Sequence, residues 1–380
     1  MKVIHLISGG DTGGAKTHVL TLLDSLHKKN IDVELLCIME GIFTEEAREL
    51  GIPVTIIPQQ RRWDLSVHRK ILDFINLSGC DLVHCHGARA NYIALFIMKK
   101  VKVPMITTLH SDYKLDFKGN ARKQMIYTPI NAFALRQFKN ILTVTYAFKK
   151  MLIERGFDAK RLHVIYNGVD FDKKLPSVAP EHFMDSVNQH YDPDKKYVGI
   201  AARMYAVKGV EVFLGAAKLL APLHPDTVFL VLGDGDMMPQ CKEFVETNNL
   251  SGQVKLLGQI QGEELMNGYY RFVDVNTLTS YSESFPYALL EGARCKCATV
   301  ATAVGGIPEM IKDGETGYLV PSGDCVALAD RIGTLLDDDN LRRNMGNNFY
   351  EDAKARFSVE SMAATHIDIY TNIIDKEKKQ

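Results

Sequence analysis

Hydrophobic residues divide the chain into short β-branched runs that alternate with longer amphipathic segments. Short apolar runs bounded by turn residues are typical of buried strands, and a period of 3.6 residues is typical of a helix. Such alternation predicts parallel sheets with right-handed crossovers. The strands expected in the first half are Val3–Ile7, Val33–Ile38, Val54–Ile57, Leu82–Cys85, Met105–Leu109, Ile141–Val144 and His163–Ile165.

Helical patterns lie between several of these strands, at Thr17–Lys28, Leu65–Leu77, Ala90–Lys99 and Tyr146–Arg155. The pattern pauses over residues 171–195, which are polar, hold three prolines and show no clear periodicity, so we expect a linker or a loosely packed connection there. A second series of strands follows, at Val198–Ala201, Val228–Leu232, Val254–Leu257, Val273–Leu278, Thr299–Ala301 and Tyr318–Val320.

The two series predict an α/β protein with two Rossmann-like, doubly wound parallel-sheet domains. We expect the first over residues 1–172 and the second over 173–357, with the amphipathic tail, about 358–380, packing back onto the first. Ligands of open parallel sheets bind beyond the carboxyl ends of the strands. We therefore expect the two domains to face each other across a ligand cleft.

The charge is balanced overall, with a formal net charge of −1, so no nucleic-acid partner is expected. It is uneven along the chain, because residues 1–172 carry 24 Lys and Arg against 17 Asp and Glu. The seven cysteines include no C-x-x-C pair, which favours free thiols in a reducing compartment. No segment approaches a signal peptide or a bilayer span, so we expect a cytoplasmic protein.

The segment from Ser280 to Glu309 carries two carboxylates, Glu283 and Glu291, around an expected helix start. Pro286 suits the first helical position, where its missing N–H costs nothing. The free amides of such a helix start form an anion site. Carboxylates on both sides of it would suit a ligand with hydroxyls and phosphate, such as a nucleotide sugar.

A glycine-rich segment, residues 8–17, follows the first expected strand. It fits neither a dinucleotide fingerprint nor a P-loop, since Ala15 separates Gly14 from Lys16, and we reject an ATPase. Either a ligand-binding turn or a plain strand-to-helix turn remains open.

Histidines end two strands of the first half. His84 and His86 share a strand face while Cys85 points away, so the three cannot hold one metal ion. Two such histidines are more often packed than metal-bound, and we expect no metal. His110 follows the next strand and either donates to a sugar hydroxyl or is structural.

In the second half, Arg203 and Lys208 follow the strand Val198–Ala201 and could both hold a diphosphate. Positive charge there would stabilise a departing nucleoside diphosphate without a metal. Asp234 and Asp236 could bind Mg²⁺, but the glycines beside them favour a turn, which we prefer.

In this order, the motifs resemble the retaining GT-B glycosyltransferases of family 4. The resemblance covers nearly the whole chain and rests on the early Gly-Gly loop, His110, Asn167-Gly168-Val169-Asp170, Arg203…Lys208-Gly209, Glu283-x7-Glu291 and Val304-Gly305-Gly306-Ile307-Pro308-Glu309.

The resemblance implies a role for each matching residue. Catalysis would involve His110, Glu283, Arg203 and Lys208. Donor binding would involve Gly14, Arg203, Lys208, Gly258, Ile260, Glu283, Phe285, Pro286, Tyr287, Ala288, Leu289 and Glu291. Glu291 would bind the ribose, Glu283 the donor sugar, and the segment Leu257–Ile260 the base.

Two departures from the family pattern concern specificity. Ser284 stands where the family often has glycine, which could narrow the sugar pocket or only bend the loop. Ala15-Lys16-Thr17 stands where the family often has Glu-Arg, which puts the acceptor in doubt.

A basic and aromatic surface is expected on the first domain, from Tyr113–Tyr127 and from Arg61-Arg62-Trp63. It would suit peripheral contact with an anionic membrane, on the inner face of the cell membrane, that holds a lipid-linked acceptor. Ordinary solvated charge explains the same residues equally well.

The expected activity is metal-independent, cofactor-free, retaining transfer of a hexose or N-acetylhexosamine from a nucleotide sugar, with UDP favoured. The acceptor would be a glycan or a lipid-linked molecule of cell-surface polysaccharide or glycolipid synthesis. The alternatives are a GT-B sugar-nucleotide epimerase and a non-catalytic nucleotide-sugar-binding protein on the same scaffold.

Overall fold

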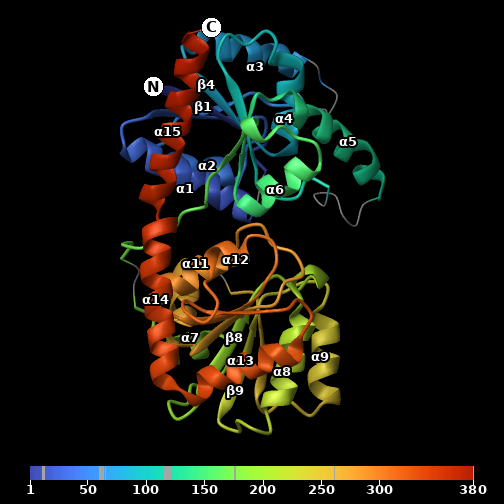
Figure 1. Cartoon of the computed structure of the whole chain (residues 1–380), viewed down its shortest axis with the longest axis vertical. Helices are drawn as coiled ribbons and strands as arrows, with labels where there is room; N and C mark the ends of the chain where they lie inside the picture. The colour runs from blue at the N-terminus through green and yellow to red at the C-terminus, as the bar shows by residue number, and fades with distance from the viewer. Residues whose placement is uncertain are drawn as a thin grey trace. The chain divides into compact units, whose positions relative to one another are not determined.

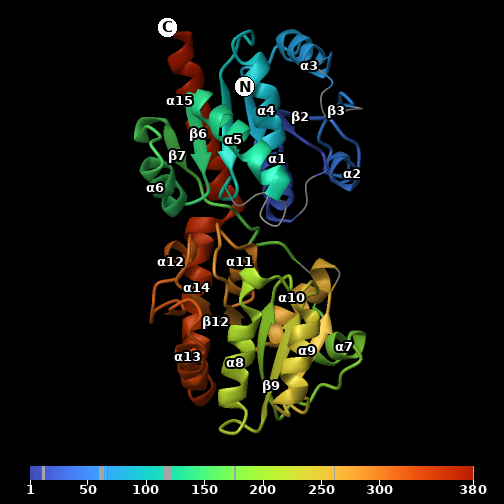
Figure 2. The same cartoon turned by 90° about the vertical axis from the view of Figure 1, so that its right-hand side faces the viewer.

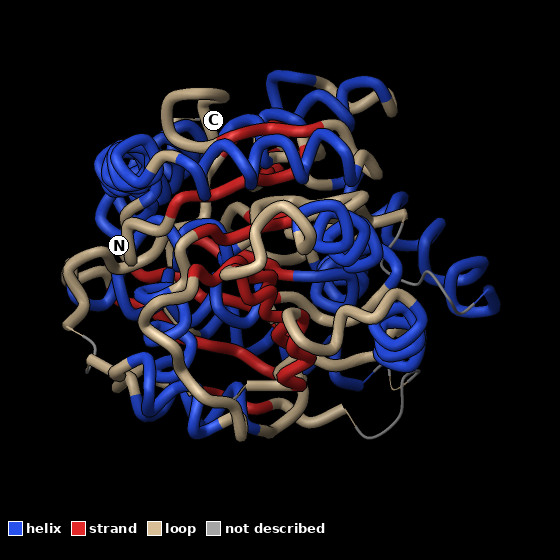
Figure 3. The backbone as a smooth tube through the Cα atoms, turned by 90° about the horizontal axis from the view of Figure 1, so that it is seen from below, coloured by secondary structure: helices blue, strands red, loops and turns tan. Residues whose placement is uncertain are grey.

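The computed structural model of the chain describes residues 1–10, 13–59, 64, 66–114, 121–174, 177–260 and 262–379. The chain forms two compact units: unit 1 comprises Met1–Gly168 and Ser358–Gln380, and unit 2 comprises Val169–Phe357. In Figure 1 the elements up to β7 (Leu162–Val164) and the red C-terminal helix α15 (Val359–Lys378) make unit 1. Strands lie between helices, as the red and blue segments of Figure 3 show.

Unit 1 contains a parallel seven-stranded sheet with strand order β3-β2-β1-β4-β5-β6-β7. Strand order reverses between β1 and β4, which pair directly. Ligands of such sheets bind at this switch point. The strands are β1 (Lys2–Ile7), β2 (Asp32–Cys37), β3 (Val54–Ile56), β4 (Leu82–His86), β5 (Met105–Leu109), β6 (Asn140–Thr143) and β7 (Leu162–Val164).

The helices of unit 1 cover this sheet, and α4 and α5 run side by side in Figure 2. They are α1 (Gly14–Lys28), α2 (Ile42–Glu49), α3 (Ser66–Leu77), α4 (Gly87–Ile97), α5 (Ala121–Gln137), α6 (Tyr146–Glu154) and α15 (Val359–Lys378), with a 3₁₀ turn at Ala159–Arg161.

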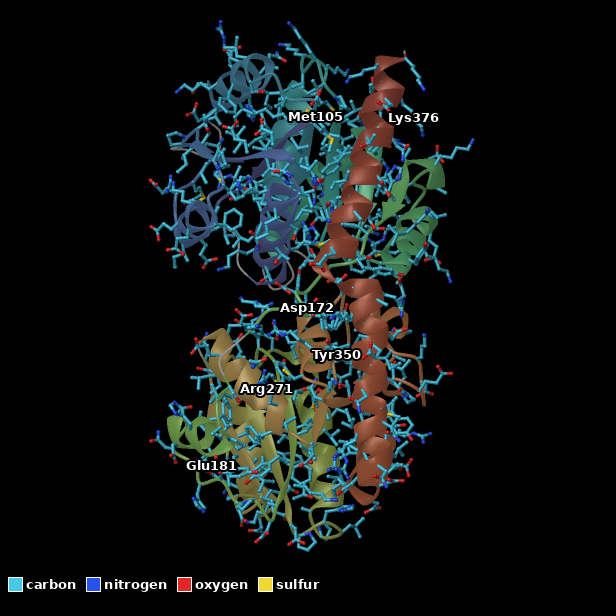
Figure 4. The ribbon with its side chains drawn as sticks, turned by 90° about the vertical axis from the view of Figure 1, so that its left-hand side faces the viewer. Met105, Asp172, Glu181, Arg271, Tyr350 and Lys376 are labelled. Carbon is cyan, nitrogen blue, oxygen red and sulfur yellow. The ribbon has the colours of Figure 1, made fainter. Side chains whose placement is uncertain are left out.

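The C-terminal helix α15 belongs to unit 1 and packs against α1. Its buried face includes Met362, Tyr370 and Ile373, and these join the same core as Leu22 of α1. Burying a large apolar side chain contributes about 1.5–3 kcal/mol, so this face stabilises the packing of the helix on unit 1. Lys376, labelled in Figure 4, lies near the end of this helix.

Unit 2 repeats the architecture with a parallel six-stranded sheet of order β10-β9-β8-β11-β12-β13. Its switch point lies between β8 and β11, which pair directly. The strands are β8 (Lys196–Ala201), β9 (Thr227–Leu232), β10 (Val254–Gly258), β11 (Val275–Leu278), β12 (Ala298–Thr302) and β13 (Tyr318–Val320).

The helices of unit 2 include the long α14, which packs on α11 and β12. They are α7 (Pro180–Ser186), α8 (Val210–Leu220), α9 (Met238–Thr247), α10 (Glu263–Phe272), α11 (Tyr287–Arg294), α12 (Ile307–Met310), α13 (Cys325–Asp337) and α14 (Asp339–Phe357), with a 3₁₀ turn at Ala206–Lys208.

The units divide between Gly168 and Val169, whereas the boundary expected from the sequence lies after residue 172. The Val169 amide donates to the Phe357 carbonyl at 3.0 Å, which ties this segment to unit 2. Asp172 and Tyr350, labelled in Figure 4, both contact Lys354 of α14.

The prediction of a linker or a loosely packed connection over residues 171–195 is wrong for the part that forms helix α7. Helix α7 lies within this segment, and its Phe183 and Met184 are buried in a cluster with Tyr197 and Tyr269. Packing therefore orders a stretch whose polar composition and prolines favour a loose connection.

Candidate functional site

The switch point of unit 2 brings three of the predicted site residues into neighbouring loops. Arg203 and Lys208 follow β8, and Glu283 follows the adjacent strand β11. Because these strands run parallel, their following loops emerge at the same edge of the sheet. Lys208 and Glu283 are 75 residues apart in the sequence, but they come together because their strands are neighbours in the sheet.

Lys208 and Glu283 form an ion pair at the centre of this group. Lys208 Nζ lies 2.5 Å from Glu283 Oε1, and the hydroxyl of Ser280 donates to the same oxygen at 2.7 Å. Their side chains are 20% and 9% exposed, so solvent reaches the ammonium more than the carboxylate. The ion pair fixes the direction of the Lys208 ammonium group.

The loops that carry this pair are fastened to each other. Thr279 Oγ1 donates to the carbonyls of Lys208 and Gly209, at 3.1 and 2.8 Å. Gly209 has φ +60°, and a Cβ there would lie 2.2 Å from the Thr279 carbonyl oxygen. Only glycine allows this close approach.

The Val304-Gly305-Gly306 segment closes on the same loop. Gly305 has φ +54°, and a Cβ would lie 1.7 Å from the carbonyl oxygen of Glu283. Gly305 thus lets the backbone of Glu283 pass close by, which is a structural reason for glycine at this position.

Arg203 is exposed, and its guanidinium lies over the Tyr205 ring at 5.6 Å. The backbone beneath it is held by the next loop, since the Met204 amide donates to the Asp234 carbonyl at 2.9 Å. Gly233 and Gly235 both have positive φ, and Cβ atoms there would strike the backbone of Ala202 and Met204. The Asp234 segment thus forms a turn that supports Arg203.

Helix α11 begins one residue later than predicted. Pro286 is the residue that precedes the helix, with ψ 121° in the extended region, and Tyr287 is the first helical residue. The proline ring fixes φ near −74°, but the extended ψ keeps Pro286 outside the helix. The free backbone amides expected at this helix start are therefore those of the residues that follow Pro286, from Tyr287 on.

The start of α11 offers two donors. Within the described part of the chain, the amides of Tyr287 and Ala288 make no hydrogen bond, whereas that of Leu289 donates to the Pro286 carbonyl. The first turn holds no acidic residue. Phe285 and Leu289 are buried, so their side chains support the turn and only backbone can meet a ligand.

Glu291 lies one turn into α11 and is partly buried. Burial raises the pKa of this carboxyl, while Arg294 opposes the shift. Beside it, the Tyr287 hydroxyl is buried and has no partner among the described residues. A carboxylate so placed can accept from ligand hydroxyls.

Gly258 and Ile260 lie at the end of β10, away from the switch point. The Gly233 amide donates to the Gly258 carbonyl at 2.7 Å, which joins this strand end to the turn below Arg203. Gly258 has φ +69° and open space where a Cβ would stand. Ile260 is partly buried against the core near Tyr197.

In unit 1, Gly14 is the first residue of α1, preceded by Gly13 with φ +66°. Lys16 Nζ lies 2.7 Å from both carboxylate oxygens of Glu46 on α2. This lysine is therefore paired within the protein. Asp11 and Thr12 of the same segment lie outside the described residues.

His110 follows β5 and meets the histidines of β4. Its Nε2 lies 3.2 Å from His86 Nδ1, and His86 Nε2 lies 3.0 Å from His5 Nδ1. His18 of α1 packs edge-on to His110, with 4.9 Å between ring centroids. His84 lies behind them, bonded to Tyr370 of α15 at 2.6 Å and to Thr108 at 2.7 Å.

Burial keeps these imidazoles neutral. It lowers the pKa of His5 to about 3 and those of His110 and His366 to about 4, and neighbouring histidines add to the shifts of His5 and His110. The pKa values of His18, His84 and His86 also lie well below 6.5 for the same reason.

Sequence reasoning missed His5, His18 and His366. A signal exists for His5, because β1 pairs in parallel with β4 and places His5 opposite His84. The order of the strands, which supplies this neighbour, is not evident from local periodicity.

One group with metal-ligand potential occurs among the described residues: His5, His84 and His86 each place a ring nitrogen within 4.8 Å of the others. Both nitrogens of His84 and of His86 already form hydrogen bonds to protein groups. These hydrogen bonds explain why the three histidine rings lie close together. A reaction without a metal ion therefore remains our expectation.

The predicted basic surface is only partly described. Arg61, Arg62 and Trp63 and residues 115–120 lie outside the described residues, as do the side chains of Arg122 and Lys123. On α5, Met125 and Phe133 are 73% and 55% exposed. No helix in the described parts of the chain has an apolar stretch that could cross a bilayer.

Known proteins of similar sequence are glycosyltransferases. N-acetyl-alpha-D-glucosaminyl L-malate synthase of Bacillus anthracis is 25% identical over 324 residues, covering 83% of this chain and 81% of that protein. D-inositol 3-phosphate glycosyltransferase of Corynebacterium urealyticum is 26% identical, covering 96% and 92%.

Solved structures share the fold. Anabaena HepE, crystallised in complex with UDP, has a TM-score of 0.81 at 20% identity, over 98% of this chain and 100% of that one. Sucrose-phosphate synthase of Thermosynechococcus elongatus has a TM-score of 0.78 at 19% identity, over 99% of each chain. The expected GT-B fold is confirmed.

Two family models account for most of the sequence. The model described as Glycosyltransferase Family 4 matches residues 12–173, and that described as Glycosyl transferases group 1 matches residues 185–352. Together with the relatives, these matches confirm the resemblance: the chain belongs to the family 4 glycosyltransferases of GT-B fold.

Proposed function

We propose that the protein transfers a hexose or N-acetylhexosamine from a nucleoside-diphosphate sugar, with UDP as the nucleotide, to a glycan or lipid-linked acceptor. The Lys208–Glu283 pair at the switch point of unit 2 carries the proposal. The loop that follows β8 therefore carries two positive groups, the ammonium of Lys208 and the guanidinium of Arg203. Unpaired amides at the start of α11 add further donors for a diphosphate.

In this proposal Arg203 and Lys208 hold the diphosphate and stabilise the charge that develops on it. Glu283 binds the donor sugar and Glu291 the ribose hydroxyls. The turn at Phe285–Leu289 contributes backbone amides, and the segment at Gly258 and Ile260 meets the base.

The reaction would retain the anomeric configuration and use no metal. The bond from the anomeric carbon to the phosphate oxygen breaks, and a bond to the acceptor oxygen forms on the same face. The acceptor proton passes to the leaving phosphate. Positive side chains at the phosphate favour this route, because they stabilise the leaving group in place of a metal ion.

The relatives support a UDP-sugar as donor. Anabaena HepE has been crystallised with UDP and with UDP-glucose, and one relative is named N-acetyl-alpha-D-glucosaminyl L-malate synthase. From unit 1, Gly14 and His110 would contact the substrates, His110 near the reacting carbon of the donor.

A panel of UDP-, GDP- and ADP-sugars tests the donor. A ligand at a hundred times its Kd stabilises the folded protein by about 2.7 kcal/mol, which a thermal-unfolding scan detects. We expect UDP-sugars to stabilise and the others not to; stabilisation by none would contradict the proposal. Conversion of the donor sugar without acceptor would indicate the epimerase, and binding without turnover the non-catalytic protein, which the unusual Ser284 makes relevant.

We also propose that unit 1 contacts an anionic membrane to reach a lipid-linked acceptor. Exposed Met125 and Phe133 on α5 support this, together with the positive charge of the first half of the chain. Vesicles containing anionic lipid should sediment the protein at low salt, and neutral vesicles should not. Failure to sediment with anionic vesicles would contradict membrane contact and favour solvated charge.

A further inference from the structure

Three imidazoles in unit 1 form a hydrogen-bonded line that ends at His110. His110 Nε2 bonds to His86 Nδ1 at 3.2 Å, and His86 Nε2 bonds to His5 Nδ1 at 3.0 Å. The last nitrogen, His5 Nε2, is buried and has no partner among the described residues. His5 is fully buried, His86 nearly so, and His110 partly exposed.

The positions of the protons along this line are coupled. A neutral imidazole carries one N–H and one bare nitrogen, so each ring donates at one end and accepts at the other. Each of the two hydrogen bonds needs one donor and one acceptor. Only two arrangements satisfy both bonds, one with every proton on Nδ1 and one with every proton on Nε2.

The buried end decides between them. With every proton on Nε2, His5 would leave an N–H group buried without an acceptor. With every proton on Nδ1, His5 leaves only a bare nitrogen unpaired. Orphaned buried donors are rarer in proteins than under-satisfied acceptors, which favours the protons on Nδ1.

The neighbouring rings do not alter this choice. His84 packs against His86 with 4.1 Å between centroids, but its nitrogens are taken by Tyr370 and Thr108. Burial lowers the pKa of all three rings of the line, so none carries the second proton that would set two donors against each other.

We propose that His5 and His86 are positioning residues that fix His110 as its Nδ1–H tautomer. His110 then presents a hydrogen-bond donor on the nitrogen not used by His86. That the group receiving this bond is a hydroxyl oxygen of the donor sugar rests on the proposed function; the tautomer itself does not.

Nitrogen-15 NMR of the full-length protein labelled at histidine reads the tautomer directly, with His110→Gln identifying the signals. We expect a protonated Nδ1 and a bare Nε2 at neutral pH. A protonated Nε2, or an average of both tautomers, would overturn the proposal whether or not the protein is a transferase.

Two substitutions at His86 cut the line at different places. The amide of Asn lies where His86 Nδ1 lies and keeps a bond to His110, whereas that of Gln reaches toward His5 and loses that bond. Because an amide offers both a donor and an acceptor, and neither variant links His110 to His5, we expect both variants to release the His110 tautomer. Tyr370→Phe is the control, since it removes a bond to His84 outside the line.

Turnover provides the second readout once a donor is identified. His86→Gln and His86→Asn should both lower kcat by about tenfold, the scale of one lost hydrogen bond, while Tyr370→Phe should stay within a factor of about three. A loss of kcat with an unchanged His110 tautomer would mean that His86 serves packing alone and would contradict a positioning role.

Discussion

The two units share one topology, but their switch points differ in chemistry. In unit 1 the strands on either side of it, β1 and β4, carry His5 and His86, which are buried and neutral. In unit 2 the switch point lies between β8 and β11, and the loops that follow these strands carry Lys208 and Glu283 as an ion pair. One fold therefore supports a neutral hydrogen-bonding site and a charged one.

The difference lies in side chains, not in the sheets or in the glycines that let backbone segments approach each other. In unit 2, Gly209 and Gly305 let backbone segments approach within distances that any Cβ would block. In unit 1, Gly9 plays a similar part, since a Cβ there would lie 2.2 Å from the Met39 carbonyl oxygen. Function thus resides in the loops that a common scaffold holds.

Acidification should produce the largest difference in stability between the two units. An unfolded histidine takes up a proton below pH 6.5, whereas the fully buried His366 stays neutral down to about pH 4. The free energy of unfolding should therefore fall as pH decreases from 6.5 toward 4, by about 2 kcal/mol at pH 5 for this residue and at least as much for His5.

Hydrogen exchange corrected for intrinsic pH dependence, followed peptide by peptide, measures this loss. Unit 1 should weaken before unit 2, because all buried histidines among the described residues belong to unit 1. His366→Phe should flatten the pH dependence. Equal weakening of both units would contradict neutral burial.

Removing positive charge from unit 2 should abolish most turnover. Lys208→Ala or Arg203→Ala should lower kcat by about 10²-fold or more, the usual effect of losing a group that stabilises developing charge. Lys218→Ala, on the exposed face of α8, is the matched control and should leave the rate unchanged. Near-normal rates in both site variants would show that the phosphate site is assigned wrongly.

Adding a methyl group at Gly305 should loosen Glu283. The clash with the Glu283 carbonyl and the positive φ should lower the free energy of unfolding of unit 2 by about 1–3 kcal/mol and weaken donor binding. Gly314→Ala has a similar φ, +78°, but open space, so urea unfolding should show a smaller loss. An equal loss of unfolding free energy in both variants would mean that the close approach of Gly305 to Glu283 has no effect on stability.

The smallest expected effect concerns α15. Tyr370→Phe removes the 2.6 Å bond to His84 and should lower the stability of unit 1 by about 1 kcal/mol. Tyr350→Phe in unit 2 is its control, because that hydroxyl makes only a 3.5 Å contact with Lys354. A neutral result for Tyr370→Phe would mean that the bond adds nothing to the docking of α15.

The sheets could be predicted from the sequence because buried parallel strands are nearly continuous hydrophobic runs. Two predicted strands, Met105–Leu109 and Tyr318–Val320, have the bounds that the structure shows. Helix α7 was not predicted, since its seven residues are too short for a periodic signal and only Phe183 and Met184 are buried.

The residue types of the site could be predicted, but their contacts could not. Lys208 and Glu283 were each recognisable after a strand, yet their pairing depends on β8 and β11 being neighbours. The line from His5 to His110 depends in the same way on β1, β4 and β5. Strand order is a tertiary property, which local periodicity does not contain.

A crystal structure of the protein with UDP would locate the diphosphate. We expect it within about 3 Å of Lys208 Nζ and of the amides at the start of α11, with Arg203 on the same group. A diphosphate bound away from these groups, or beside the neutral histidines of unit 1, would contradict this expectation.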